Sequence, residues 1–110
     1  MKNQPITEAN QQFDLRAAAF LAKALTDENR LRIIQSLSAG KKPVSRIVEE
    51  LGISQPLASH HLKELKRSLL VNVERSGPFV YYELSDPRIV TILAGLGGLA
   101  TDLLAARTTF

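Results

Sequence analysis

Apolar residues recur with helical spacing along the first third of the chain. Over residues 8–25 they follow one another at intervals of three and four, which predicts an amphipathic helix. Thr26-Asp27 offers an N-cap for a second helix, and Gly40 suits its C-terminal cap. We expect residues 1–7 to be a flexible polar arm and residues 8–107 to form a single domain.

The middle of the chain predicts two short helices joined by a tight turn. Residues 44–51 carry apolar side chains at positions i, i+3, i+4 and i+7, which gives that helix one buried face. In the turn, Gly52 supplies the left-handed residue and Ser54 caps the following helix, where Pro56 in the first turn costs no hydrogen bond. This helix is expected to cover residues 55–69. Its inward stripe is Ala58, Leu62, Leu65 and Leu69.

The pattern changes to strand-like alternation in the last third of the chain. Residues 71–75 and 79–84 alternate as strands do, and Ser76-Gly77-Pro78 joins them as a hairpin tip. A final helix is expected to begin at Asp86-Pro87 and to run to about Arg107. The sequence therefore predicts a mainly α chain with a small β-hairpin. About five helices and a two-stranded wing make up the arrangement called a winged helix-turn-helix.

The second helix of the central pair has a polar outer face that suits duplex DNA. An α-helix fits the major groove, where its side chains reach base edges and phosphates. Gln55 can bond adenine bidentately, and Lys63 and Arg67 can neutralise phosphates. A solvated face is the commoner explanation of such a stripe, but the preceding turn and the following hairpin favour DNA binding. The expected DNA-binding residues are Ser54, Gln55, Pro56, Ser59, His60, Lys63, Arg67 and Arg75.

Three segments resemble the ArsR/SmtB family of prokaryotic repressors. They are LTDENRLRIIQSLSAG, VSRIVEELGISQPLASHHLKELKRSLLV and FVYYELSDP, and the resemblance extends from about Ala19 to Leu93. It implies a homodimeric repressor with a recognition helix that begins at Gln55. It also implies an operator that is an imperfect inverted repeat and is released when an inducer binds. The first and last helices would form the dimer interface, through Phe13, Ala17, Leu21, Ile92, Leu96, Leu99 and Leu103.

The metal ligands that many members of this family use are missing. The chain has no cysteine, which excludes thiolate metal sites, disulfides and thiol or persulfide sensing. His60 and His61 are its two histidines, and neighbours on a helix point apart. At the family's usual metal positions stand Lys42-Pro43-Val44-Ser45 and, in the last helix, Asp86, Arg88, Leu99 and Asp102. We therefore expect no metal, no cofactor and an inducer that is not a transition metal.

Charge and composition agree with a small cytoplasmic DNA-binding protein without identifying one. The net charge of +3 and the pI of about 9.5 suit an anionic partner. The N-terminal segment lacks the apolar core of a signal peptide, and the uncharged stretch Ile89–Ala100 is too short to span a bilayer. The sequence offers no activated nucleophile and no paired catalytic carboxylates, so we do not expect an enzyme.

Several alternatives stay open at this point. His61 lies nearer the apolar side of its helix than His60, and we expect it to pack or hydrogen-bond. Because Arg75 is the one basic residue near the wing tip, a protein-interaction module without specific DNA binding is the alternative function. Glycines in the final helix predict either close packing at a dimer interface or a cavity for a small apolar inducer. These glycines are Gly95, Gly97 and Gly98.

Overall fold

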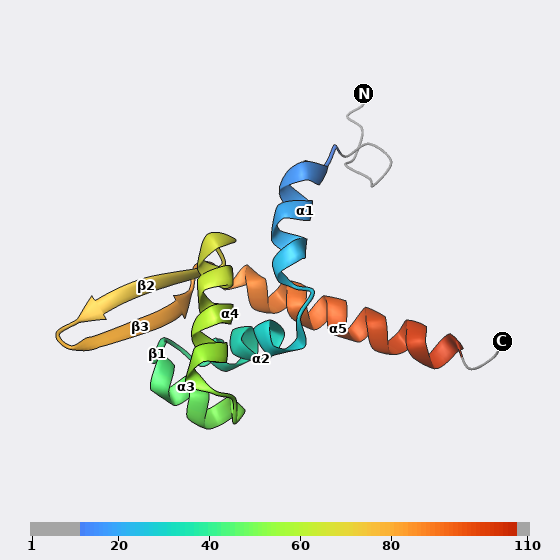
Figure 1. Ribbon diagram of the computed structural model, residues 1–110. Coiled ribbons are helices and arrows are strands. Elements are labelled where there is room, and N and C mark those ends of the chain that lie inside the picture. The colour runs from blue at the N-terminus through green and yellow to red at the C-terminus, as the bar shows by residue number, and fades with distance from the viewer. Residues whose placement is uncertain (1–11, 108–110) are drawn as a thin grey trace.

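The computed structural model describes residues 12–107, which form five helices and a three-stranded antiparallel sheet (Figure 1). The predicted arm, residues 1–7, and the start of the predicted domain, residues 8–11, lie outside the described residues. The elements are α1 Leu15–Ala24, α2 Glu28–Leu37, β1 Lys42–Pro43, α3 Val44–Leu51, α4 Gln55–Arg67, β2 Val71–Ser76, β3 Phe79–Leu84 and α5 Arg88–Ala106. The predicted winged helix-turn-helix order is confirmed.

The core lies between α2, α3 and α4, with the base of the wing and the start of α5 against it. Leu70 and Val71 contribute from the α4–β2 junction, and Ile89 contributes from α5. Five large apolar side chains are fully buried in it: Ile33, Ile34, Ile47, Leu62 and Leu65. Because they come from three helices with helical spacing, they fix the rotation of each helix about its own axis.

The wing has one more strand than the sequence predicts. β2 and β3 pair from Val71↔Leu84 to Ser76↔Phe79, and Gly77 makes the tip with a left-handed φ of 60°. Lys42 and Pro43, for which the sequence pattern predicts no strand, pair with Tyr82 and Tyr81 as the edge strand β1. A two-residue strand is too short to show alternation, and its partner lies far along the chain, so local pattern could not reveal it.

The start of α1 and the end of α2 differ from the prediction. α1 begins at Leu15 rather than at residue 8, because the Asp14 carboxylate caps it by accepting a hydrogen bond from the Ala17 amide at 3.0 Å. α2 ends at Leu37 with Ser38 as its cap, so Gly40 lies two residues beyond that cap. The caps predicted at Asp27 and Ser54 and the left-handed Gly52 are confirmed.

The end of α4 corrects one predicted core residue. α4 ends at Arg67, and Leu69 takes a left-handed φ of 66°, which is unusual for a residue with a branched side chain. This reversal turns Leu69 out to 70% exposure and puts Leu70 into the core. The inward stripe of α4 therefore consists of Ala58, Leu62 and Leu65, without Leu69.

α1 and α5 extend away from the core, as Figure 1 shows. The radius of gyration is 17.2 Å, whereas a compact chain of this length has about 13 Å. Each of these helices buries one residue, Ala24 in α1 and Ile89 in α5. α5 has 19 residues and is long and apolar enough to cross a membrane by length and composition, which alone is weak evidence. The uncharged stretch Ile89–Ala100, on which the expectation was based, is only part of this longer helix, which also contains Arg88 and Asp102.

Two leucine-to-alanine variants test the burial pattern of α4. Leu62→Ala removes a fully buried side chain, and we expect it to lower the free energy of unfolding by about 2–5 kcal/mol. Leu69→Ala keeps the same backbone geometry and removes an exposed side chain, so the expected change is within about 0.5 kcal/mol. Urea unfolding followed by circular dichroism measures both. Equal losses would contradict the outward placement of Leu69.

Candidate nucleic-acid interface

The polar face of α4 points away from the core. Its apolar side is buried through Ala58, Leu62 and Leu65, and α3 packs across it. The side chains opposite this stripe are therefore held at the surface of a helix whose rotation is fixed. All the expected DNA-binding residues are exposed: Ser54, Gln55, Pro56, Ser59, His60, Lys63, Arg67 and Arg75. Exposure makes a DNA contact possible, and the assignment itself stays a prediction.

The N-terminus of α4 has few free backbone N–H groups to offer a phosphate. The Ser54 hydroxyl oxygen accepts a hydrogen bond from the Leu57 amide at 3.2 Å, so this amide is occupied. Pro56 has no N–H group at all. Among residues 12–107, the backbone N–H of Gln55 is therefore the one donor in the first turn of α4 that has no partner. A phosphate bound here would need contacts from side chains as well.

A groove of about 390 Å³ separates α4 from the wing. We call it the α4–wing groove. Lys63 and Lys66 line it from α4, and Arg75 lines it from β2. The rest of its lining is Val44, Ser59, Val73, Val80 and Tyr82. Val73 pairs with Tyr82 and Arg75 pairs with Val80 across the strands, so these residues form a continuous surface beside the helix.

The positive charge of the α4–wing groove is not compensated. In the part of the chain that the structure describes, Lys63, Lys66 and Arg75 make no ion pair. Several cations elsewhere in this part of the chain are paired. Examples are Lys41–Glu74 at 3.0 Å, Lys42–Glu50 at 2.7 Å and Arg88–Asp86 at 2.9 Å. Within residues 12–107, Arg16, Lys23 and Arg32 also make no ion pair, but Lys63, Lys66 and Arg75 lie together around one groove where the helix meets the wing, which suits a polyanion.

Two cations of α4 differ from the sequence prediction. Arg67 is paired with Glu64 at 2.7 Å and does not line the groove, so it lies apart from the other expected phosphate contacts. Lys66, which the sequence reasoning missed, does line it. The signal was present in the spacing, because Lys66 follows Lys63 by three residues and Ser59 by seven, on one side of a helix.

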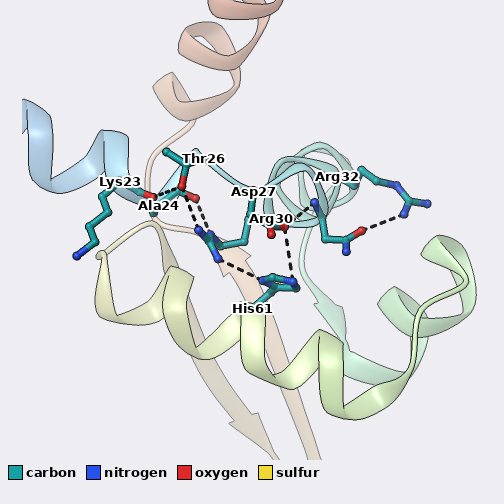
Figure 2. A network of polar contacts seen from close by, with 8 residues as sticks. Lys23, Ala24, Thr26, Asp27, Arg30, Arg32 and His61 are labelled. Atoms are coloured by element: carbon teal, nitrogen blue, oxygen red, sulfur yellow. Dashed lines mark hydrogen bonds and ion pairs between the residues drawn. The ribbon is translucent and has the colours of Figure 1, made fainter.

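The two histidines of α4 have different surroundings. His60 is exposed, whereas His61 is only 4% exposed, which confirms the expected packing role. Figure 2 shows the His61 ring between Asp27 and Arg30. The nitrogens Arg30 Nη1 and His61 Nδ1 are 3.3 Å apart, and His61 Nε2 lies 3.6 Å from Asp27 Oδ1. His61 is therefore part of the junction between α4 and the start of α2.

The pKa values of this junction follow from its burial and charges. Burial lowers the pKa of His61 from its ordinary value of 6.5, and the Arg30 guanidinium lowers it further, although Asp27 acts in the opposite direction. Burial raises the pKa of the Asp27 carboxyl, but hydrogen bonds from the Arg30 and Asn29 amides outweigh burial and hold the pKa below its ordinary value. His61 is thus neutral and Asp27 ionised at neutral pH.

The expected dimer residues lie on the exposed sides of α1 and α5, with Phe13 just before α1. They are Phe13, Ala17, Leu21, Ile92, Leu96, Leu99 and Leu103. An open apolar concavity of about 530 Å³ lies between α1 and the start of α5, lined by Phe20, Leu21, Leu69 and Ile92 among others. The glycines of α5 lie outside it, and a Cβ added at any of them would meet no atom within 4 Å. Nothing among residues 12–107 of one chain therefore requires these glycines.

Metal-binding residues do not come together in residues 12–107. Groups of three or more histidine, cysteine, aspartate or glutamate side chains placed to hold an ion are absent from this part of the chain. His60 and His61 have ring centroids 5.2 Å apart and tilted planes, and His61 faces the α2 junction.

Comparisons with known proteins agree on one family. A family model described as bacterial regulatory protein, arsR family, matches residues 27–73, from the α2 cap to β2. The transcriptional repressor SdpR of Bacillus subtilis is 38% identical over 57% of this chain and 70% of that protein. A probable mercury resistance operon repressor of Streptomyces lividans is 36% identical over 76% of this chain and 67% of that protein.

A solved structure supports the same assignment. The homodimeric winged helix-turn-helix DNA-binding domain of a possible ArsR-family regulator from Mycobacterium bovis has a TM-score of 0.72 and 29% identity. The match covers 84% of this chain and 90% of that one. Fold, central motif and sequence identity thus agree, and the chain belongs to the ArsR family of bacterial regulatory proteins.

Proposed function

We propose that this protein is a cytoplasmic transcriptional repressor that binds operator DNA as a homodimer, with α4 in the major groove. The observation that carries the proposal is the continuity of the exposed face of α4 with the uncompensated positive charge of the α4–wing groove. A phosphodiester backbone beside the major groove would lie where these cations are. The repressors and the DNA-binding domain that the chain resembles support the same function.

The exposed residues divide into two roles. Gln55 and Ser59, exposed near the start of α4, are the proposed contacts to base edges, where an amide can bond adenine. Lys63, Lys66 and Arg75, which line the groove, are the proposed contacts to phosphates. The remaining predicted residues Ser54, Pro56, His60 and Arg67 flank these positions on the same helix.

The homodimer is proposed to form through α1 and α5. In one chain these helices present a row of exposed apolar residues, and leucines at this density are rarely left in water. A two-fold dimer puts two copies of α4 about 34 Å apart on an imperfect inverted repeat. The apolar concavity beside Leu21 and Ile92 is where a non-metal inducer would act on the spacing of the two helices.

The deciding experiment is DNA binding by fluorescence anisotropy over a salt series. DNA from upstream of the protein's own gene is compared with a scrambled duplex. A preference of about 10³ or more for the natural sequence supports a specific regulator. Weak and equal binding to both duplexes would favour a winged-helix protein-interaction module instead.

Gln55→Ala tests base recognition. If Gln55 contacts a base, its truncation costs roughly 1–3 kcal/mol on the natural site and relaxes the preference at one base position. Binding to a set of single-base operator variants measures this. A uniform loss at all sequences would place Gln55 at the backbone rather than at a base.

Lys66→Gln and Arg67→Gln form a matched pair for the phosphate contacts. Lys66 carries an unpaired charge in the groove. Its loss should therefore make the negative slope of the log of the DNA association constant against the log of the salt concentration shallower by about 0.9. Arg67 is already paired with Glu64, so its loss should change the slope less. A larger effect of the Arg67 variant would show that the backbone lies on the other side of α4.

Leu99→Glu tests the dimer surface. Leu99 lies in the row Ile92, Leu96, Leu99 and Leu103, so a buried glutamate there should convert the protein to monomers and abolish binding to two half-sites. Leu104→Glu is the control, since Leu104 is equally apolar and exposed but lies outside that row. Light scattering after size exclusion measures both. A dimeric Leu99 variant would contradict this interface.

A further inference from the structure

His61 is a polar side chain on the recognition helix that cannot face DNA. It is the one buried polar or charged residue among residues 12–107. Its ring points toward the junction of α1 and α2, as Figure 2 shows, while the predicted DNA contacts lie on the opposite side of α4. A buried imidazole costs free energy unless its nitrogens have partners, so its contacts indicate what it does.

Arg30 connects His61 to the end of α1. Its Nε donates to the carbonyl of Ala24, the last residue of α1, at 2.7 Å. Its Nη2 donates to Thr26 Oγ1 at 3.5 Å, and that hydroxyl donates to the Lys23 carbonyl at 2.8 Å. Its Nη1 reaches His61 Nδ1 at 3.3 Å. One guanidinium therefore holds together α1, the α1–α2 turn and the recognition helix.

This arrangement requires one protonation state of His61. An arginine N–H can only donate, so Nδ1 must be the unprotonated, accepting nitrogen. The neutral ring then carries its proton on Nε2, which faces Asp27 Oδ1 at 3.6 Å. Asp27 Oδ1 is also the cap of α2, because it accepts hydrogen bonds from the Asn29 and Arg30 amides. The neutral Nε2–H tautomer is the one state that fits both neighbours.

We propose that Arg30 and neutral His61 are positioning residues that couple the position of α1 to the position of the recognition helix α4. Protonation of His61 breaks this link and releases DNA. A proton on Nδ1 removes the acceptor of Arg30 and brings two N–H donors and two positive charges together. Arg30 must then move, and the Ala24 carbonyl at the end of α1 loses its donor. The inference rests on the proposed function, since it takes α4 as the DNA-reading helix.

The charges around His61 decide the direction of the effect. From the α1–α2 side, Arg30 opposes protonation and Asp27 favours it, while Lys23 lines the adjoining pocket with Arg30. From α4 itself, His60 opposes protonation and Glu64 favours it. Burial is the largest influence and opposes the charged ring, so the pKa of His61 in the folded protein is below 6.5.

The lowered pKa of His61 determines the pH range in which its contribution to stability is lost. A histidine with a lowered pKa in the folded state stabilises the fold fully above its unfolded value of 6.5. That contribution is lost as the pH falls from 6.5 through the lower folded value. Acid should therefore weaken both the fold and DNA binding through His61. Ordinary surface histidines have the opposite effect on DNA binding, because their positive charge attracts phosphate.

The test compares the natural chain with His61→Gln, so that His60 is present in both proteins and its own titration cancels. Anisotropy titrations on DNA from upstream of the protein's own gene are run between about pH 7.5 and about pH 5.5, where side chains other than histidine titrate little. A glutamine amide at position 61 can accept from Arg30 and donate toward Asp27, but it does not titrate.

The expected result is a loss of affinity with acid that depends on His61. Relative to His61→Gln, the natural chain should bind up to about tenfold more weakly at the lower pH, which is the limit set by a one-unit difference in the pKa of His61 between free and bound protein. His61→Gln keeps the capacity for both hydrogen bonds and should bind at neutral pH. An acid response that is the same in both proteins, or affinity that rises with acid in the natural chain relative to His61→Gln, would overturn the proposal.

A second measurement separates this inference from the proposed function. NMR follows the His61 ring and the amide exchange of α4 in the free His60→Gln protein as the pH falls. Protonation that coincides with a loss of exchange protection in α4 and at the end of α1, after the intrinsic pH dependence of amide exchange is divided out, supports the coupling even if no DNA binds at neutral pH. Protonation with unchanged protection would overturn it.

Arg30→Lys tests the other partner. A lysine has no planar fork and cannot hold the Ala24 carbonyl and His61 together. It should weaken DNA binding at neutral pH and remove the acid response, while thermal unfolding shows that the variant is folded. Arg88→Lys is the matched control, because Asp86 is the one side-chain partner of Arg88 within the described residues 12–107. Native DNA binding and an intact acid response in Arg30→Lys would contradict the coupling.

Discussion

The burial of Leu62 and Leu65 against the isoleucines of α2 and α3 determines which side of α4 faces outward. A helix presents one face to a core, and its opposite face follows from that choice. If these two leucines were rotated by one position, Lys63 and Lys66 would turn toward the core and the groove beside the wing would lose its charge. The polar surface thus depends on apolar contacts on the other side of the same helix.

Charge pairing adds a second level of organisation to that surface. Glu74, Glu50, Asp86 and Glu64 each neutralise a cation in their own neighbourhood. Exposed pairs of this kind contribute little to stability. Their effect on the field is larger, because they remove positive charge from the flanks and leave it between α4 and the wing. A net charge of only +3 is therefore compatible with a local positive site.

Local signals in the sequence predicted most of the helices, two caps and the turn at Gly52, since side-chain period and capping chemistry act within a few residues. The errors come from contacts between distant residues. β1 exists because Lys42 meets Tyr82, and the role of His61 depends on Arg30, more than thirty residues earlier. Leu69 was misplaced because helical spacing was continued past the point where the backbone reverses. Lys66 was within reach of the sequence, as its spacing from Ser59 and Lys63 shows.

In a single chain, apolar side chains of α1 and α5 remain exposed to water, so the single chain is not the complete assembly. If two chains cover these sides as proposed, the active species forms by mass action, and its amount varies with the square of the monomer concentration when dimers are scarce. Occupancy of an operator would then respond more steeply to the rate of synthesis than it would for a monomeric regulator. Dilution during growth would act as a signal in its own right, without any small molecule.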